Sequence, residues 1–203
     1  MNFMTRLKHW QVFLLVYGIP IIAYIYFLRR MISAMDAMEY TEPFREMQAL
    51  VWVMMPFLLF YMFWFLATGL ALHRRLPPQV NMNRNRFVLI TLISTLLNLV
   101  AIFLMTRWFL RFPEWVETAQ DPAVFPVELL RIMIPVMVMQ LIAMAGFVYM
   151  FIFIGKALKS VETKTEAHGD SYIGEFFLLW FWPIGIWLLQ PRINRIFAAN
   201  KNG

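Results

Sequence analysis

The chain has 203 residues, of which 61% are hydrophobic and 15% charged, and its mean hydropathy is +0.62. Soluble domains are typically about 45–50% apolar, so this composition excludes an ordinary soluble protein, and the length leaves no room for a second sizeable domain. The formal net charge of +6 would suggest a nucleic-acid partner in a soluble protein, but here Lys and Arg gather at the ends of apolar stretches, so we expect none. The chain contains no cysteine, which excludes disulfides and thiolate metal sites.

Four stretches without Asp, Glu, Lys or Arg follow one another along the chain: residues 10–28, 49–72, 87–106 and 132–155. Each is close to the 20 or so apolar residues that an α-helix needs to cross about 30 Å of hydrocarbon. The sequence therefore predicts an all-α polytopic membrane protein, with four long helices in an up-down-up-down bundle. Proline interrupts three of the spans, at positions 20, 56 and 135, and predicts a kink in each.

A shorter apolar segment, residues 172–190, precedes a basic tail, residues 191–203. Pro183 removes a backbone donor and Gly185 loosens the turn, so the sequence predicts a bend between two half-helices that enter and leave the membrane on the same side. The alternative is a short, kinked fifth helix that crosses. A bent backbone at membrane depth needs protein to satisfy its polar groups, so a re-entrant segment should pack against the four spans.

The distribution of Lys and Arg predicts the orientation. With a cytoplasmic N-terminus and a re-entrant fifth segment, 12 Lys and Arg lie inside and 6 outside, whereas a crossing fifth helix makes the two sides equal. The first arrangement obeys the positive-inside rule. We therefore expect Ser171 and Asn200 to face the cytoplasm, and the short connections are typical of a bacterial cytoplasmic (inner) membrane.

Polar residues inside the spans are few. Thr91, Ser94, Thr95 and Asn98 recur at spacings of three and four, which places them in one stripe on the third helix, and Gln140 lies at a comparable depth on the fourth. We interpret Asn98 and Gln140 as structural groups that bond each other or a neighbouring backbone. The alternative is a polar substrate path along the stripe, although a path for ions or protons usually includes an intramembrane acid or base.

Glu175 is the one acid that adjoins an apolar core. With His168 it could serve acid–base chemistry, and with Asp170 it could ligate a metal. The favoured interpretation is that Asp170 and Ser171 cap the first half-helix, with Glu175 in its first turn. We therefore expect no catalytic residue, metal or cofactor.

The fifth segment has no polar face, because large apolar side chains surround its axis. Trp180, Trp182 and Trp187 are the largest of them. Burial against protein would remove this surface from water, so the segment is predicted to dock onto the bundle or onto a partner.

No motif identifies a reaction or a substrate. The favoured hypothesis is a non-enzymatic integral membrane subunit or scaffold of a larger membrane complex, with the lipid bilayer and other membrane subunits as partners. A small transporter or channel, possibly a homo-oligomer, is the alternative, and a lipid-acting membrane enzyme is less favoured.

Overall fold

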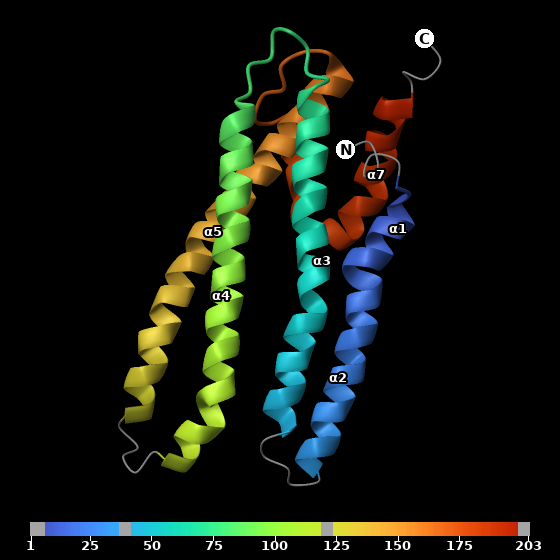
Figure 1. Ribbon diagram of the computed structural model, residues 1–203. Coiled ribbons are helices and arrows are strands. Elements are labelled where there is room, and N and C mark those ends of the chain that lie inside the picture. The colour runs from blue at the N-terminus through green and yellow to red at the C-terminus, as the bar shows by residue number, and fades with distance from the viewer. Residues whose placement is uncertain (1–6, 37–41, 119–123, 199–203) are drawn as a thin grey trace.

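The computed structural model of the protein describes residues 7–36, 42–118 and 124–198. Long helices lie side by side with short connections between them, as Figure 1 shows. The helices in chain order are α1 (His9–Phe13), the π-helical turn η2 (Leu14–Gly18), α2 (Ile19–Asp36), α3 (Glu42–His73), α4 (Arg84–Thr118), α5 (Val124–Thr163), α6 (Ile173–Trp180) and α7 (Trp182–Ala198).

Four helices are long and apolar enough to cross a membrane: His9–Ala34, Gln48–His73, Arg84–Arg111 and Leu130–Thr163, with lengths of 26 to 34 residues. A helix of 26 residues is about 39 Å long, which exceeds the thickness of the hydrocarbon core. Each predicted apolar stretch lies inside one of these helices. The predicted all-α polytopic membrane fold is confirmed.

The first span contains a π-helical turn just before Pro20. The Ile19 N–H donates to the carbonyl of Leu14, five residues back, and Pro20 has no N–H to offer the carbonyl of Val16. A wider turn at this point accommodates the missing donor. The other two spans differ, because α3 continues through Pro56 and α5 through Pro135.

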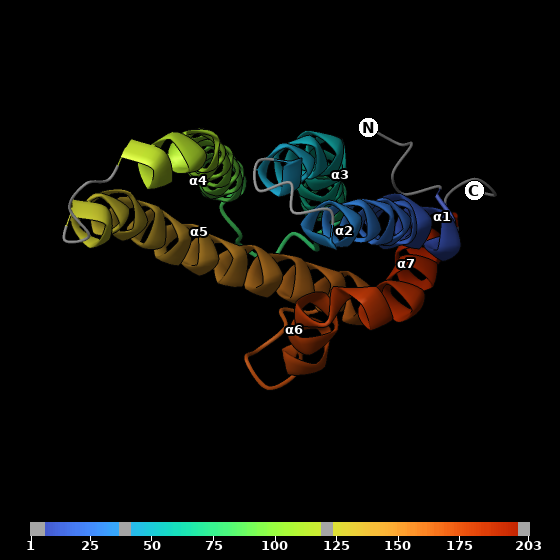
Figure 2. The same ribbon diagram turned by 90° about the horizontal axis from the view of Figure 1, so that it is seen from below.

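The spans form two antiparallel pairs, α2 with α3 and α4 with α5. Seen along the bundle in Figure 2, α5 runs beneath the other spans and carries α6 on its outer side. Small residues allow close helix contacts: a Cβ on Gly146 of α5 would lie 1.8 Å from Ser94 Oγ of α4. A Cβ on Gly69 of α3 would lie 2.3 Å from the ring of Phe87. Both glycines therefore set how near two helices approach.

The C-terminal segment forms a hairpin of two helices. In Figure 1, α7 runs from about mid-height of the bundle to the end that also holds the connections between α3 and α4 and between α5 and α6. We call this the hairpin end. Because α6 begins and α7 ends there, residues 173–198 enter and leave on the same side and do not cross the bundle.

The hydrophobic core is concentrated near the hairpin end and joins every helix there. Its fully buried large side chains come from α3, α4, α5 and the hairpin: Trp64, Phe65, Leu72, Phe87, Met150, Ile154, Leu158, Leu179, Trp182, Ile186, Leu189 and Ile193. The hairpin thus contributes to the protein's own core and is docked onto its own bundle.

Candidate functional site

The turn of the hairpin lies at Phe181, one residue before the predicted bend. The Phe181 carbonyl accepts hydrogen bonds from the N–H groups of Ile184 (3.0 Å) and Gly185 (2.9 Å), which start α7. Pro183 occupies the second residue of α7, where a backbone donor is not required. A Cβ on Gly185 would lie 1.7 Å from the carbonyl oxygen of Leu178, so α6 and α7 approach each other at a position that only glycine fits.

Trp182 fills an aromatic box between the hairpin and two spans. Its ring centroid lies 5.5 Å from that of Tyr17, 5.3 Å from Tyr61 and 5.4 Å from Trp64, and the last two pairs are edge-to-face. Such pairs add roughly 0.5–1.5 kcal/mol each beyond the burial of area. Within the described residues the Trp182 Nε1 has no hydrogen-bond acceptor, so ring contacts alone hold the indole.

The other two tryptophans of the segment face outward. Trp180 and Trp187 are each almost half exposed, and Trp187 packs at 4.6 Å from His9 and 5.6 Å from Phe13. The hairpin therefore has one face in the protein core and another that is apolar and exposed.

Gln190 connects the hairpin to α3 and to the segment just before α1, and the sequence did not point to it. Its side chain is fully buried and accepts a hydrogen bond from Trp64 Nε1 at 3.1 Å. Its Nε2 donates to the carbonyl of Leu7 at 3.1 Å and to Asn194 Oδ1 at 3.0 Å. Asn194 Nδ2 donates to the same Leu7 carbonyl at 2.9 Å. In the sequence, the only signal for this site is a glutamine that follows a run of apolar residues and immediately precedes Pro191.

A charged cluster locks α6 and α7 to α5. Arg192 donates from Nε and Nη2 to the two carboxylate oxygens of Glu162, at 2.8 and 2.5 Å, and from Nη2 to Glu175 Oε1 at 2.6 Å. Lys159 Nζ lies 4.0 Å from the same Glu175 oxygen. The hydrogen bonds that Arg192 donates to Glu162, and then to Glu175, raise the pKa of Arg192 above its ordinary value although burial opposes the shift. Two cations and two carboxylates compensate each other.

The predicted cap of α6 is wrong. Helix α6 begins after Tyr172, which makes no side-chain cap hydrogen bond, and the Ser171 hydroxyl donates to the carbonyl of His168 at 2.7 Å. Ser171 is used in the preceding turn, so neither it nor Asp170 caps the helix. Glu175 is in the first turn of α6, as expected, but it is 5% exposed and paired with Arg192.

The polar stripe of α4 is directed at its own backbone. The hydroxyls of Thr91 and Thr95 donate to the carbonyls four residues earlier, both at 2.8 Å, and Asn98 Nδ2 donates to the carbonyl of Ser94 at 2.8 Å. Thr91 and Ser94 are buried. Among the described residues no hydrogen bond joins Asn98 to Gln140. Of the two predicted partners, Asn98 therefore bonds a neighbouring backbone carbonyl and not the other amide side chain.

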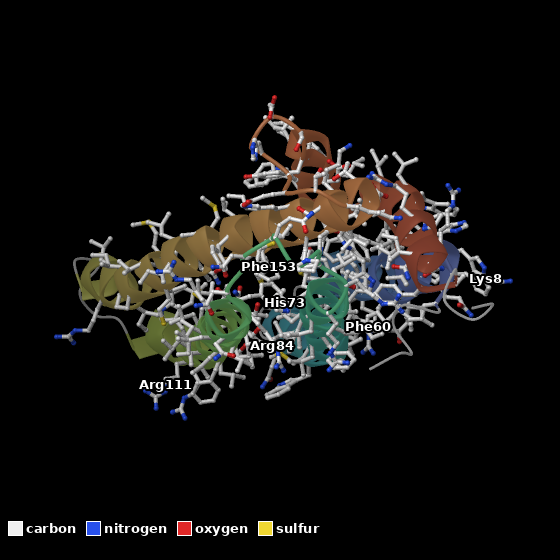
Figure 3. The ribbon with its side chains drawn as sticks, turned by 90° about the horizontal axis from the view of Figure 1, so that it is seen from above. Lys8, Phe60, His73, Arg84, Arg111 and Phe153 are labelled. Atoms are coloured by element: carbon white, nitrogen blue, oxygen red, sulfur yellow. The ribbon has the colours of Figure 1, made fainter. Side chains whose placement is uncertain are left out.

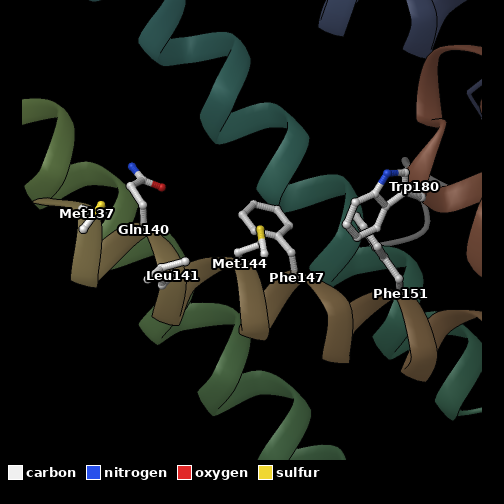
Figure 4. A pocket seen from close by; sticks show the side chains of 7 residues that line it. All are labelled: Met137, Gln140, Leu141, Met144, Phe147, Phe151 and Trp180. Carbon is white, nitrogen blue, oxygen red and sulfur yellow. The ribbon is translucent and has the colours of Figure 1, made fainter.

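Gln140 instead lines an apolar pocket on the side of α5. Figure 4 shows its carboxamide beside Met137 and Leu141, with Phe147, Phe151 and Trp180 further along the pocket. The pocket has a volume of about 420 Å³ and also includes Met144. Gln140 is exposed, and within the described residues its side chain has no hydrogen-bond partner.

His73, at the hairpin end, packs on an aromatic ring. Figure 3 shows His73 and Phe153 close together where α3 meets α5; their rings are nearly parallel, 6.2 Å apart, and Phe153 stacks on Phe87 at 4.2 Å. His73 Nε2 lies 2.8 Å from the carbonyl oxygen of Met82. In the part of the chain that the structure describes, no group of three His, Cys, Asp or Glu residues could hold a metal ion.

Comparisons of the chain with protein-family models, with curated proteins and with solved structures find no match. The geometry defines a class: a helical multi-pass membrane protein whose C-terminal segment is a helical hairpin that begins and ends at the same end of the bundle.

Proposed function

We propose that the protein is a non-enzymatic integral membrane subunit or scaffold of a larger membrane protein complex, and that Gln140 lies where a partner helix docks. The observation that carries the proposal is the exposed carboxamide of Gln140, ten residues inside the fourth span, in a pocket whose other side chains are almost entirely apolar. An amide in hydrocarbon costs several kcal/mol unless it is hydrogen-bonded. A polar side chain or freed carbonyl of a second membrane protein would supply the missing partner.

The first span supports the same proposal. Only 6% of its most apolar window is buried, against 33% for the fourth span. Tyr24 and Tyr26 are both more than half exposed near the middle of this span. Tyrosine hydroxyls usually find a hydrogen-bond partner when they leave water, so a protein neighbour suits this face better than acyl chains alone.

The stripe on α4 does not support the transporter alternative, because Thr91, Thr95 and Asn98 donate hydrogen bonds to the backbone of their own helix and Ser94 is buried against Gly146. Glu175, on which the lipid-acting enzyme rested, is buried in ion pairs with Arg192 and Lys159. A scaffold needs neither a path nor a reactive group.

The proposal includes a bacterial inner membrane with the hairpin end in the cytoplasm. The 12 Lys and Arg of the inner count belong to the N-terminal segment, to the two connections with the helix ends beside them, and to the C-terminal segment. Both connections and the end of α7 lie at the hairpin end. The opposite end carries 6, which fits the positive-inside rule.

Site-specific photo-crosslinking tests the proposal. A photoreactive amino acid replaces Gln140 in one variant and Leu92, an exposed residue on α4, in a control. We expect position 140 to give one adduct of reproducible mass with another membrane protein, and position 92 to give mainly lipid adducts. An adduct of twice the mass of the chain would favour the homo-oligomer, and lipid adducts alone at position 140 would contradict a docking site there.

A further inference from the structure

A second, polar pocket lies at the hairpin end, and nothing in the proposed function uses it. It has a volume of about 720 Å³. We call it the basic pocket. Its lining comes from three parts of the chain: the connection after α3 (Arg75, Leu76, Pro77, Pro78 and Gln79), the end of α5 (Val161, Glu162 and Lys164), and the last turns of α7 (Arg195 and Ile196).

Three cations converge on the basic pocket without a carboxylate partner. Within the described residues, Arg75, Lys164 and Arg195 make no ion pair, whereas the nearby Arg192 and Lys156 are both paired. The one acid in the lining is Glu162, and its two oxygens are both occupied by Arg192. The basic pocket therefore carries a net positive charge that the chain itself does not neutralise.

The walls of the basic pocket are held in place. The guanidinium of Arg75 lies over the ring of Phe197, 5.3 Å from its centroid. Gln79 Nε2 donates to the carbonyl of Lys164 at 2.8 Å, which ties the α3–α4 connection to the segment after α5. Lys164 is the only non-glycine residue with positive φ in the described part of the chain, at 57°. Lys164 directly follows the last residue of α5, and a residue in the left-handed conformation commonly ends a helix at this position, so the conformation fixes where the chain turns away from α5 beside the pocket.

We propose that the basic pocket binds the phosphate group of an anionic ligand. Arginine presents several N–H donors in a planar fork that matches phosphate oxygens, and lysine adds a compact charge. The pocket lies at the end of the bundle, level with the ends of the spans, where phospholipid headgroups and free phosphates are both within reach. The inference is independent of the proposed complex and would hold for a monomer.

Thermal melting of the full chain in a neutral detergent tests the site, because a ligand that binds only the folded state raises the free energy of unfolding by RT ln(1 + L/Kd), where L is the free ligand concentration. The rise in melting temperature over a series of ligand concentrations therefore gives the Kd. The probes are short-chain phosphatidylglycerol, short-chain phosphatidylcholine and inorganic phosphate. We expect a rise that follows this logarithmic dependence with phosphatidylglycerol, and none with phosphatidylcholine, if the ligand is an anionic headgroup. A rise of the same form with phosphate, and no tighter binding of phosphatidylglycerol, would assign a free phosphate.

The variants separate binding from folding. Arg75→Gln with Arg195→Gln should weaken binding of the active probe about tenfold or more, since each removes a charge-assisted hydrogen bond. Lys164→Gly also removes a charge but relieves the positive φ, so its melting temperature without ligand should stay the same or rise while its affinity falls several-fold.

The control is Arg74→Gln with Arg84→Gln, two exposed arginines at the same end that do not line the basic pocket. It removes the same charge and should change the affinity by less than about threefold. An equal loss in the control and the pocket variants would show general surface attraction and overturn the proposal. So would the absence of any rise in melting temperature with both anionic probes, or an unchanged affinity in Lys164→Gly.

Discussion

Single residues decide whether the hairpin forms, and Gly185 is the most demanding of them. A methyl group at this position would lie 1.7 Å from the Leu178 carbonyl oxygen, which is backbone and cannot rotate away. Gly185→Ala should therefore destabilise the protein by at least about 2 kcal/mol, in the upper range of overpacking substitutions. Thermal melting in detergent measures the loss.

Gly174 provides the matched control for this substitution. A Cβ there meets nothing within 4 Å, and the residue is exposed in the first turn of α6. Gly174→Ala should leave stability unchanged or raise it by up to about 1 kcal/mol through helix propensity. Similar melting temperatures for the two alanine variants would contradict the close contact between α6 and α7.

Gln190 is the second decisive residue, because three buried groups depend on it. Gln190→Leu keeps the approximate volume but removes the acceptor for Trp64 Nε1 and a donor to the Leu7 carbonyl. We expect a loss of about 1–3 kcal/mol, the cost of leaving buried polar groups unpaired. Combined with Trp64→Phe, it should cost less than the two single losses together, because both remove the same hydrogen bond. Strict additivity would mean that this bond contributes nothing.

At the scale of helices, the ion-pair cluster is what aligns α7 with α5 and α6. Arg192→Gln removes the ion pair of Glu162 and leaves the buried Glu175 with Lys159, 4.0 Å away, as its remaining cation. We therefore expect a loss of about 1–3 kcal/mol, reduced from that of a fully buried pair because the Arg192 side chain is 29% exposed. The double variant, Arg192→Gln with Glu175→Gln, should be more stable than Arg192→Gln alone, because the second change removes the uncompensated buried carboxylate. Arg195→Gln, also on α7, is the control and should be near neutral.

The pH dependence of this cluster follows from the raised pKa of Arg192. A cation whose pKa is higher in the folded than in the unfolded state stabilises the fold fully below the unfolded value and loses that stabilisation only as the pH rises through the folded value. Because even the ordinary pKa of arginine lies far above this range, melting between pH 6 and 9 should show no loss from this group. A fall in wild-type stability over that range that disappears in Arg192→Gln would contradict the assignment.

The helices were largely predictable and their contacts were not. The four apolar stretches and the bend near Pro183 are local signals, because each is fixed by composition or by proline and glycine within a few residues. The partners of Gln190 and Arg192 are not local: Trp64 is 126 residues from Gln190, and Glu162 is 30 from Arg192. Which side chains meet at such separations depends on crossing angles and helix register, which a single sequence does not encode in a readable pattern. The capping prediction failed for a related reason, since Ser171 found a nearer acceptor in its own turn.

For the whole molecule, the hairpin makes a definite prediction about membrane topology. Single cysteines at Ser171 and Ala198 of this Cys-free chain should both resist an impermeant maleimide in intact cells, and both should react once the membrane is opened. Ser33→Cys, exposed near the opposite end of the first span, should react from outside. Labelling of position 198 but not 171 from outside would mean that the fifth segment crosses. Asn200, predicted to share this side, lies outside the described residues.

The last prediction concerns how the hairpin relates to the four spans. Each span is apolar enough to insert alone, so a chain that ends at residue 172 should still enter the membrane. Its folded state should nevertheless be lost or strongly destabilised, because the deletion removes Leu179, Trp182, Ile186, Leu189 and Ile193 from the core and leaves Trp64 Nε1 without its acceptor. Cysteine accessibility measures insertion, and thermal melting with protease resistance measures folding. A matched variant, Ile184→Ala with Leu188→Ala, changes only exposed side chains of the same hairpin and should melt close to the wild type. If the truncated chain melts like the full one, the hairpin is an accessory to the bundle, and its buried face is not part of the core that holds the spans together.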